Sequence, residues 1–169
     1  MNPSLPGFTR ENWRSTIRRY VTGHPDYADM QNWCGIETAD IVYEDKEGTL
    51  TEKLVEADNL PSGYRGCRPR YYIEVKTTPG PWDTPFHMSH PQYEKVSCGV
   101  YSSLLLYMVI NFQYKMKGFS TQDSIYVIFR VFNLYTDQIG VKLYVDPVKL
   151  ESEGRLIFAA DRWTVRPRS

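Results

Sequence analysis

The chain has 169 residues, a length that fits one domain with a hydrophobic core of its own and leaves little room for two. Its 20 basic and 20 acidic residues balance, which excludes a uniformly basic nucleic-acid-binding protein but not a local basic surface beside an acidic site. The 13 tyrosines and 4 tryptophans are many for this length, and we expect most of them to pack in a β-rich core.

The cysteines and the apolar segments indicate the cellular compartment in which the protein is expected. Cys34, Cys67 and Cys98 are widely spaced and form no C-x-x-C pair, so we expect neither a structural zinc site nor a disulfide framework. Such usage is typical of a reducing compartment and predicts an intracellular protein, nuclear or cytoplasmic. The N-terminus lacks the apolar core of a secretory signal, and the most apolar run, 104–112, is about half of a membrane span, so no membrane role is expected.

The first predicted element is a helix over 9–21. Trp13, Ile17 and Val21 recur at helical spacing, Thr9 is a suitable N-cap, and Gly23 is a stop signal. The other face carries arginines, for which a solvated surface is a commoner role than a nucleic-acid contact.

A β-hairpin is predicted next, with a strand over 39–44, a turn at 45–48 and a return strand over 49–55. Residues 56–69 are rich in glycine and proline and are expected to form a loop. Asp40 lies on the first strand and Glu37 just before it. Because Val42 and Glu44 share the face of Asp40, the pattern leaves open whether Asp40 points inward.

The central predicted strand, 70–78, carries the most suggestive pair of side chains. Alternation places Glu74 and Lys76 on one face, about 7 Å apart along the backbone. A carboxylate can hold a hard divalent cation, and a neighbouring lysine can orient water or offset charge on a phosphate, so the pair suits phosphodiester hydrolysis. Glu-x-Lys is also a common surface pair without function. A catalytic role needs a second acid, for which Asp40 is the candidate.

Beyond this strand we expect a short strand over 85–89, then a helix that has Ser89 as its N-cap and carries Gln92. Residues 104–114 favour a helix, and 124–133 and 140–145 favour a second hairpin. Two roles stay open for each of three polar residues. Ser89 either caps the helix or contacts phosphate, Gln92 either orients water or is a surface amide, and Arg130 either binds phosphate or forms a buried ion pair.

Three sequence blocks, in this order, resemble a known family. They are a Glu-x-Lys strand, a Phe-x-x-Ser segment and a Tyr-x-x-x-Arg-Val strand, here Glu74 and Lys76, Phe86 and Ser89, and Tyr126, Arg130 and Val131. With Asp40 on the preceding strand, they resemble the PD-(D/E)XK nuclease core, and more narrowly the domain at the C-terminus of the plant protein NO VEIN and its fungal relatives. The resemblance runs from about 36 to 145. Ala39 stands where the superfamily has a proline, and 97–124 is an expected insertion.

The resemblance implies an α/β fold of the restriction-endonuclease-like kind, with a mixed central sheet flanked by helices. Residues 1–169 would be a single domain excised from a larger protein, since family members are commonly the tails of proteins that carry an ATPase region. That ATPase region would then be an intramolecular partner. The oligomeric state is not indicated.

The implied activity is that of a Mg²⁺- or Mn²⁺-dependent endonuclease acting on DNA or RNA. Asp40, Glu74 and the backbone carbonyl of Val75 would hold the cation, Lys76 would position or activate the attacking water, and Gln92 would assist. The residues expected to contact nucleic acid are Arg65, Arg68, Arg70, Ser89 and Arg130. The alternative is a catalytically silent module that binds nucleic acid or protein, because one fold hosts many functions.

Overall fold

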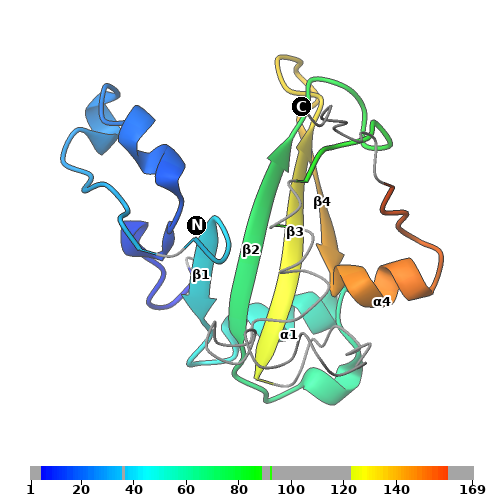
Figure 1. The fold of residues 1–169 in the computed structure, drawn as a ribbon. Helices are drawn as coiled ribbons and strands as arrows, with labels where there is room; N and C mark the ends of the chain where they lie inside the picture. The colour runs from blue at the N-terminus through cyan, green and yellow to red at the C-terminus, as the bar shows by residue number, and fades with distance from the viewer. Residues whose placement is uncertain (1–4, 36, 89–91, 93–122, 160–169) are drawn as a thin grey trace, which may run out of the picture.

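The computed structural model of the chain describes residues 5–35, 37–88, 92 and 123–159. A four-stranded mixed sheet with the order β1-β2-β3-β4 forms its centre (Figure 1). The strands are β1 (Ile41–Glu44), β2 (Arg70–Thr77), β3 (Ser124–Phe132) and β4 (Gly140–Val145). β2 runs antiparallel to β1 and parallel to β3, and β4 runs antiparallel to β3. The predicted α/β class with a mixed sheet is confirmed at this level.

The two central strands are the segments richest in β-branched and aromatic residues, which fit a pleated surface buried on both sides. Their bounds agree with the predicted strands over 70–78 and 124–133, and the predicted hairpin with 140–145 is also present. These predictions are confirmed because β-branched and aromatic composition favours strands here.

Each face of the sheet packs against its own cluster. On one face, Tyr71, Ile125 and Val127 contact Leu54 and Val55 of α1 (Thr49–Glu56). The opposite face, here called the site face, carries a second cluster: Val42, Tyr72, Tyr126 and Ile128 with Phe86, Met88, Tyr144, Val148 and Phe158. Val148 belongs to α4 (Pro147–Ser152), a helix the sequence did not predict. By strand alternation, Glu74 and Lys76 also lie on the site face.

The predicted return strand over 49–55 is wrong, because this segment forms α1. Asp45 is fully buried and its carboxylate accepts hydrogen bonds from the backbone N–H and the hydroxyl of Thr51, both at 2.8 Å. These bonds satisfy a donor in the first helical turn. Thr51, Leu54 and Val55 are buried and fall at helical spacing, so the helix buries them together.

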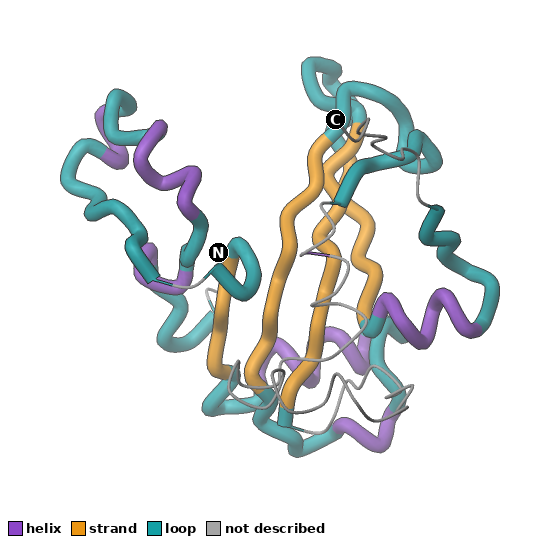
Figure 2. The backbone as a smooth tube through the Cα atoms, in the orientation of Figure 1, coloured by secondary structure: helices purple, strands orange, loops and turns teal. Residues whose placement is uncertain are grey.

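The predicted helix over 9–21 is also wrong. Two short 3-10 turns, η1 (Arg10–Asn12) and η2 (Thr16–Tyr20), replace it, and Trp13 between them forms a bridge with Ile41. The backbone N–H of Arg14 donates to the carbonyl of Asp40 at 2.7 Å. Pairing with the outer edge of β1 therefore interrupts the helical pattern, and the segment lies beyond that edge of the sheet (Figure 2).

Two further 3-10 turns are η3 (Pro25–Tyr27) and η4 (Ser62–Tyr64), the second inside the predicted loop 56–69. Residues 85–88 form no strand, although one was predicted over 85–89. The predicted helix over 104–114, the insertion apart from its last two residues, and Ser89 lie outside the described residues. Among the described helices, none has the length and apolar character that crossing a bilayer requires.

Candidate active site

Asp40 lies where β1 begins, beside Glu74 of β2. The antiparallel register pairs Ile41 with Ile73, so its continuation places Asp40 opposite Glu74. The Oδ2 atom of Asp40 accepts a hydrogen bond from the backbone N–H of Val75 at 2.8 Å. The side chain thus replaces a ladder bond just before β1 begins, which answers the question that the sequence left open: Asp40 is partly buried and turned toward β2.

Glu74 is the centre of a cluster of polar side chains. Its side chain is 4% exposed, and its Oε1 lies 3.1 Å from Nζ of Lys76. The Nε2 of Gln92 donates to the same oxygen, while Nζ of Lys76 donates to Oε1 of Gln92 at 2.9 Å. The hydroxyl of Tyr126 donates to Oε2 of Glu74 at 3.5 Å. Glu74, Lys76 and Gln92 therefore hold one another in fixed positions.

Burial and negative charge together raise pKa values in this set. Burial raises the pKa of Glu74 and the charge of Asp40 raises it further, whereas the Lys76 ammonium lowers it and Glu37 again raises it. Burial, followed by the charge of Glu74, raises the pKa of the Tyr126 hydroxyl. One ammonium thus faces several carboxylates, and an additional cation would relieve their repulsion.

Asp40, Glu74 and the Val75 carbonyl form an oxygen donor set suited to a hard divalent cation. In an extended strand the N–H and C=O of one residue point to the same side, so the Val75 carbonyl faces the edge where Asp40 accepts the Val75 N–H. No group of three or more His, Cys, Asp or Glu side chains in the described part of the chain could hold a metal by itself. Water or phosphate oxygens would have to complete the coordination, as is usual for Mg²⁺. Two carboxylates that share one ammonium fit such an ion.

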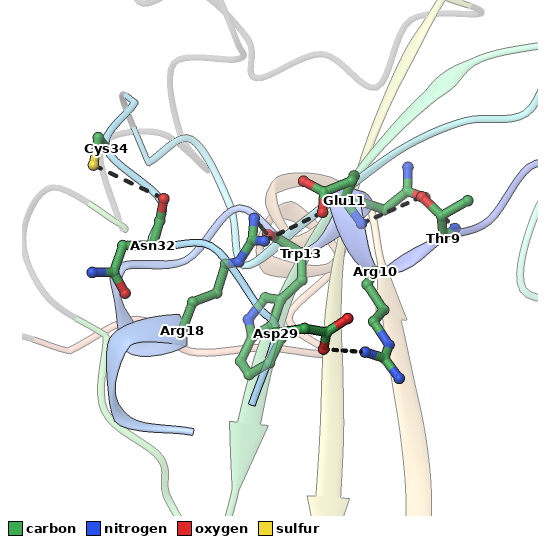
Figure 3. A network of polar contacts seen from close by, with 9 residues as sticks. Thr9, Arg10, Glu11, Trp13, Arg18, Asp29, Asn32 and Cys34 are labelled. Carbon is green, nitrogen blue, oxygen red and sulfur yellow. Dashed lines mark hydrogen bonds and ion pairs between the residues drawn. The ribbon is translucent and has the colours of Figure 1, made fainter. Parts of the chain in front are cut away.

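The N-terminal segment supports the acidic side of this site, which the sequence analysis missed. Its Ser15 and Thr16 hydroxyls donate to the two carboxylate oxygens of Glu37, each at 3.0 Å. Figure 3 shows how the segment is folded: Arg18 reaches back to the carbonyl of Trp13 at 3.1 Å, and Arg10 pairs with Asp29 at 2.9 Å. The only signal in the sequence was Ser15, a suitable N-cap in the middle of the predicted helix.

Arg130 is buried within the site face. Its side chain lies one strand beyond Lys76, is 0% exposed, donates from Nη2 to the Thr84 carbonyl at 2.9 Å, and lies 4.8 Å from the centre of the Phe86 ring. Its Nε and Nη1 find no acceptor among the described residues, and burial lowers its pKa. One of the two roles expected for Arg130 was a buried ion pair. Among the described residues, its guanidinium instead contacts a backbone carbonyl and an aromatic ring.

Three of the arginines predicted to bind nucleic acid lie near the other end of β2. Arg70 begins this strand and pairs with Glu44, so its backbone is about 20 Å from that of Lys76. Arg65 pairs with Glu52 at 2.8 Å. Arg68 is exposed and lines a shallow hollow with Arg70.

The predicted residues thus form two groups. Asp40, Glu74, Val75, Lys76 and Gln92 meet at one place, with Arg130 on the next strand, whereas Arg65, Arg68 and Arg70 lie apart from them. Comparison of this chain with protein-family models, with curated proteins and with solved structures finds no match.

Proposed function

We propose that the chain is a metal-dependent nuclease domain that hydrolyses phosphodiester bonds, built on a restriction-endonuclease-like core. The observation that carries the proposal is the position of two carboxylates and an ammonium on adjacent strands. Asp40 contacts the backbone of Val75 at 2.8 Å, and Glu74 lies 3.1 Å from Lys76. The order of the Glu-x-Lys, Phe-x-x-Ser and Tyr-x-x-x-Arg-Val blocks in the sequence supports the same assignment.

Each residue has a distinct role in this proposal. Asp40, Glu74 and the Val75 carbonyl would hold Mg²⁺ or Mn²⁺. When bound, the cation supplies Lewis-acid chemistry, making water a better nucleophile and offsetting charge on the phosphate. The Lys76 ammonium orients the attacking water or donates to a phosphate oxygen.

Two neighbours keep Glu74 and Lys76 in place. Gln92 bonds both Glu74 and Lys76, so its amide sets the distance between carboxylate and ammonium. Tyr126 donates to the remaining oxygen of Glu74 and is a positioning residue. Both side chains therefore limit the rotation of the groups that would act on the phosphate.

A second candidate is a module that binds nucleic acid or protein without cleaving. The observation that favours it is that Lys76, Gln92 and Tyr126 already satisfy the Glu74 carboxylate within the fold. A closed arrangement of this kind also serves as a purely structural ion pair. A measurement of nucleic-acid cleavage distinguishes the two candidate functions.

The test is incubation of the wild-type chain with single- and double-stranded DNA and RNA, with Mg²⁺ or Mn²⁺. We expect metal-dependent products from the wild type and, in Asp40→Ala, a loss on the order of 10² to 10⁴ in rate, as for removal of a positioned catalytic group. Asp137→Ala, at an exposed position in the β3–β4 turn, is the matched control. A wild type inactive on all four substrates with both metals would favour the binding module.

A further inference from the structure

A row of three cationic residues crosses the site face. The strand register places Lys76 of β2 beside Arg130 of β3, and Arg130 beside Lys142 of β4. Neighbouring strands are about 4.8 Å apart, so the row extends about 10 Å from the carboxylate site. Within the described part of the chain, only Lys76 of the three has a carboxylate partner. Like charges directly opposite one another destabilise a sheet, so the row favours an anion at its accessible end. Arg130 is 0% exposed beneath Thr84 and Phe86, which leaves Lys142 as that end.

The row ends at an exposed aromatic side chain. The Nζ of Lys142 lies 3.6 Å from the centre of the Trp82 ring and 5.5 Å from that of Tyr144. Trp82 is 51% exposed although it is large and apolar. The ammonium lies over one face of the indole, so a base would stack on the other face while the ammonium serves the phosphate.

The loop that carries Trp82 is held at the Lys76 end of the sheet. The N–H of Leu134 donates to the Thr78 carbonyl at 3.2 Å, and the N–H of Asn133 donates to the Gly80 carbonyl at 2.9 Å. These bonds fix the loop after β2 to the turn after β3 (Figure 1). Trp82 and the carboxylate site therefore belong to one end of one face.

We propose that the Trp82 end of this face binds single-stranded nucleic acid, with a base stacked on Trp82 and a backbone phosphate at Lys142. The inference rests on the proposed nuclease function, and it adds the strandedness of the substrate and the residues that recognise it. Single strands are specified because a base that is paired and stacked in a duplex does not offer its face to an indole. Lys142 is partly exposed and has no carboxylate partner among the described residues, so its charge favours a polyanion as the occupant.

The test measures binding without cleavage. Fluorescence anisotropy of a labelled single-stranded oligonucleotide, with chelator and no divalent metal, gives the affinity of each variant. We expect Trp82→Ala to weaken binding about tenfold or more, as loss of one stacked base does, and Trp82→Phe to restore most of the affinity. Tyr20→Ala is the matched control, since Tyr20 is 70% exposed, lies 4.7 Å from the Arg19 guanidinium, and belongs to η2, beyond the β1 edge of the sheet (Figure 2).

Two further measurements separate stacking from charge. Lys142→Ala should reduce the slope of log affinity against log salt by about one, as loss of one phosphate contact does. On an oligonucleotide without bases, Trp82→Ala should bind as the wild type does. Unchanged affinity in Trp82→Ala, equal losses in Trp82→Ala and Tyr20→Ala, or tighter binding of duplex than of single strand would overturn the inference.

Failure of this inference and failure of the nuclease proposal give different results. Metal-dependent cleavage by a wild type whose binding does not depend on Trp82 would overturn the stacking site and leave the nuclease proposal standing. Binding that depends on Trp82, in a protein that cleaves no substrate, would support the stacking site and overturn the nuclease proposal.

Discussion

At the scale of single residues, Glu74 carries a charge that its surroundings disfavour. Burial and the charge of Asp40 raise its pKa above the ordinary value of 4.5, despite the Lys76 ammonium nearby. Between the ordinary and the raised pKa, the folded chain therefore holds a proton that the unfolded chain has lost. Stability must then fall as pH rises through this interval, because the unfolded state binds fewer protons.

Glu74→Gln removes this titration and keeps the shape of the side chain. We expect the melting temperature of the variant, measured relative to wild type, to increase as pH rises above 4.5 and to level off beyond the raised pKa. Added Mn²⁺ should stabilise the wild type and not the variant, because ion binding favours the charged carboxylate. Thermal melts at a series of pH values measure both effects. A pH-independent difference between the two proteins would contradict the account.

At the scale of elements, the contrast between β2 and α1 shows what the sequence could predict. In β2, alternation, β-branched residues and the following Thr-Thr-Pro-Gly all indicate a strand. In 49–56 the apolar residues fit both a period of two and a helical period, since Leu50 and Leu54 satisfy either. The hydrogen bonds from Thr51 to the Asp45 carboxylate favour the helix over the strand. This contact is buried and depends on tertiary packing. The predicted helix over 9–21 was wrong for a similar reason. Trp13 pairs with Ile41, which is distant in the sequence, and local patterns do not show such a contact.

The Asp45 network joins three elements and should contribute strongly to stability. Besides its bonds to Thr51, Asp45 accepts a hydrogen bond from the Tyr43 hydroxyl at 3.4 Å, and the hydroxyls of Thr51 and Tyr71 lie 2.9 Å apart. Asp45→Ala would leave buried donors unsatisfied, so we expect the free energy of unfolding to fall by about 3 kcal/mol. Urea unfolding measures this, with Asp137→Ala as the exposed control. A loss no larger than that of the control would show that the network is not needed to hold α1.

At the scale of the whole molecule, some residues of the site could be predicted from sequence patterns, whereas others come together only in the fold. The positions of Glu74 and Lys76 on one face follow from their spacing, and Asp40 and Gln92 were expected beside them. The support of Glu37 by Ser15 and Thr16, and the row from Lys76 to Lys142, depend on strand order and register between distant segments. No local pattern encodes that register, so these features could not be predicted.

In the proposed mechanism, Lys76 aids the chemical step, whereas Asp40 and Glu74 hold the cation. The most direct test measures Mn²⁺-dependent nicking by Lys76→Ala, with Mn²⁺ binding followed by calorimetry at millimolar metal on the same sample. We predict nicking reduced on the order of 10² to 10⁴, with the heat of Mn²⁺ binding largely retained. Asp40→Ala combined with Glu74→Ala should lose both, and Lys149→Ala, an exposed lysine on α4, should lose neither. Nicking that persists in Lys76→Ala, or Mn²⁺ binding that survives loss of both carboxylates, would contradict the account.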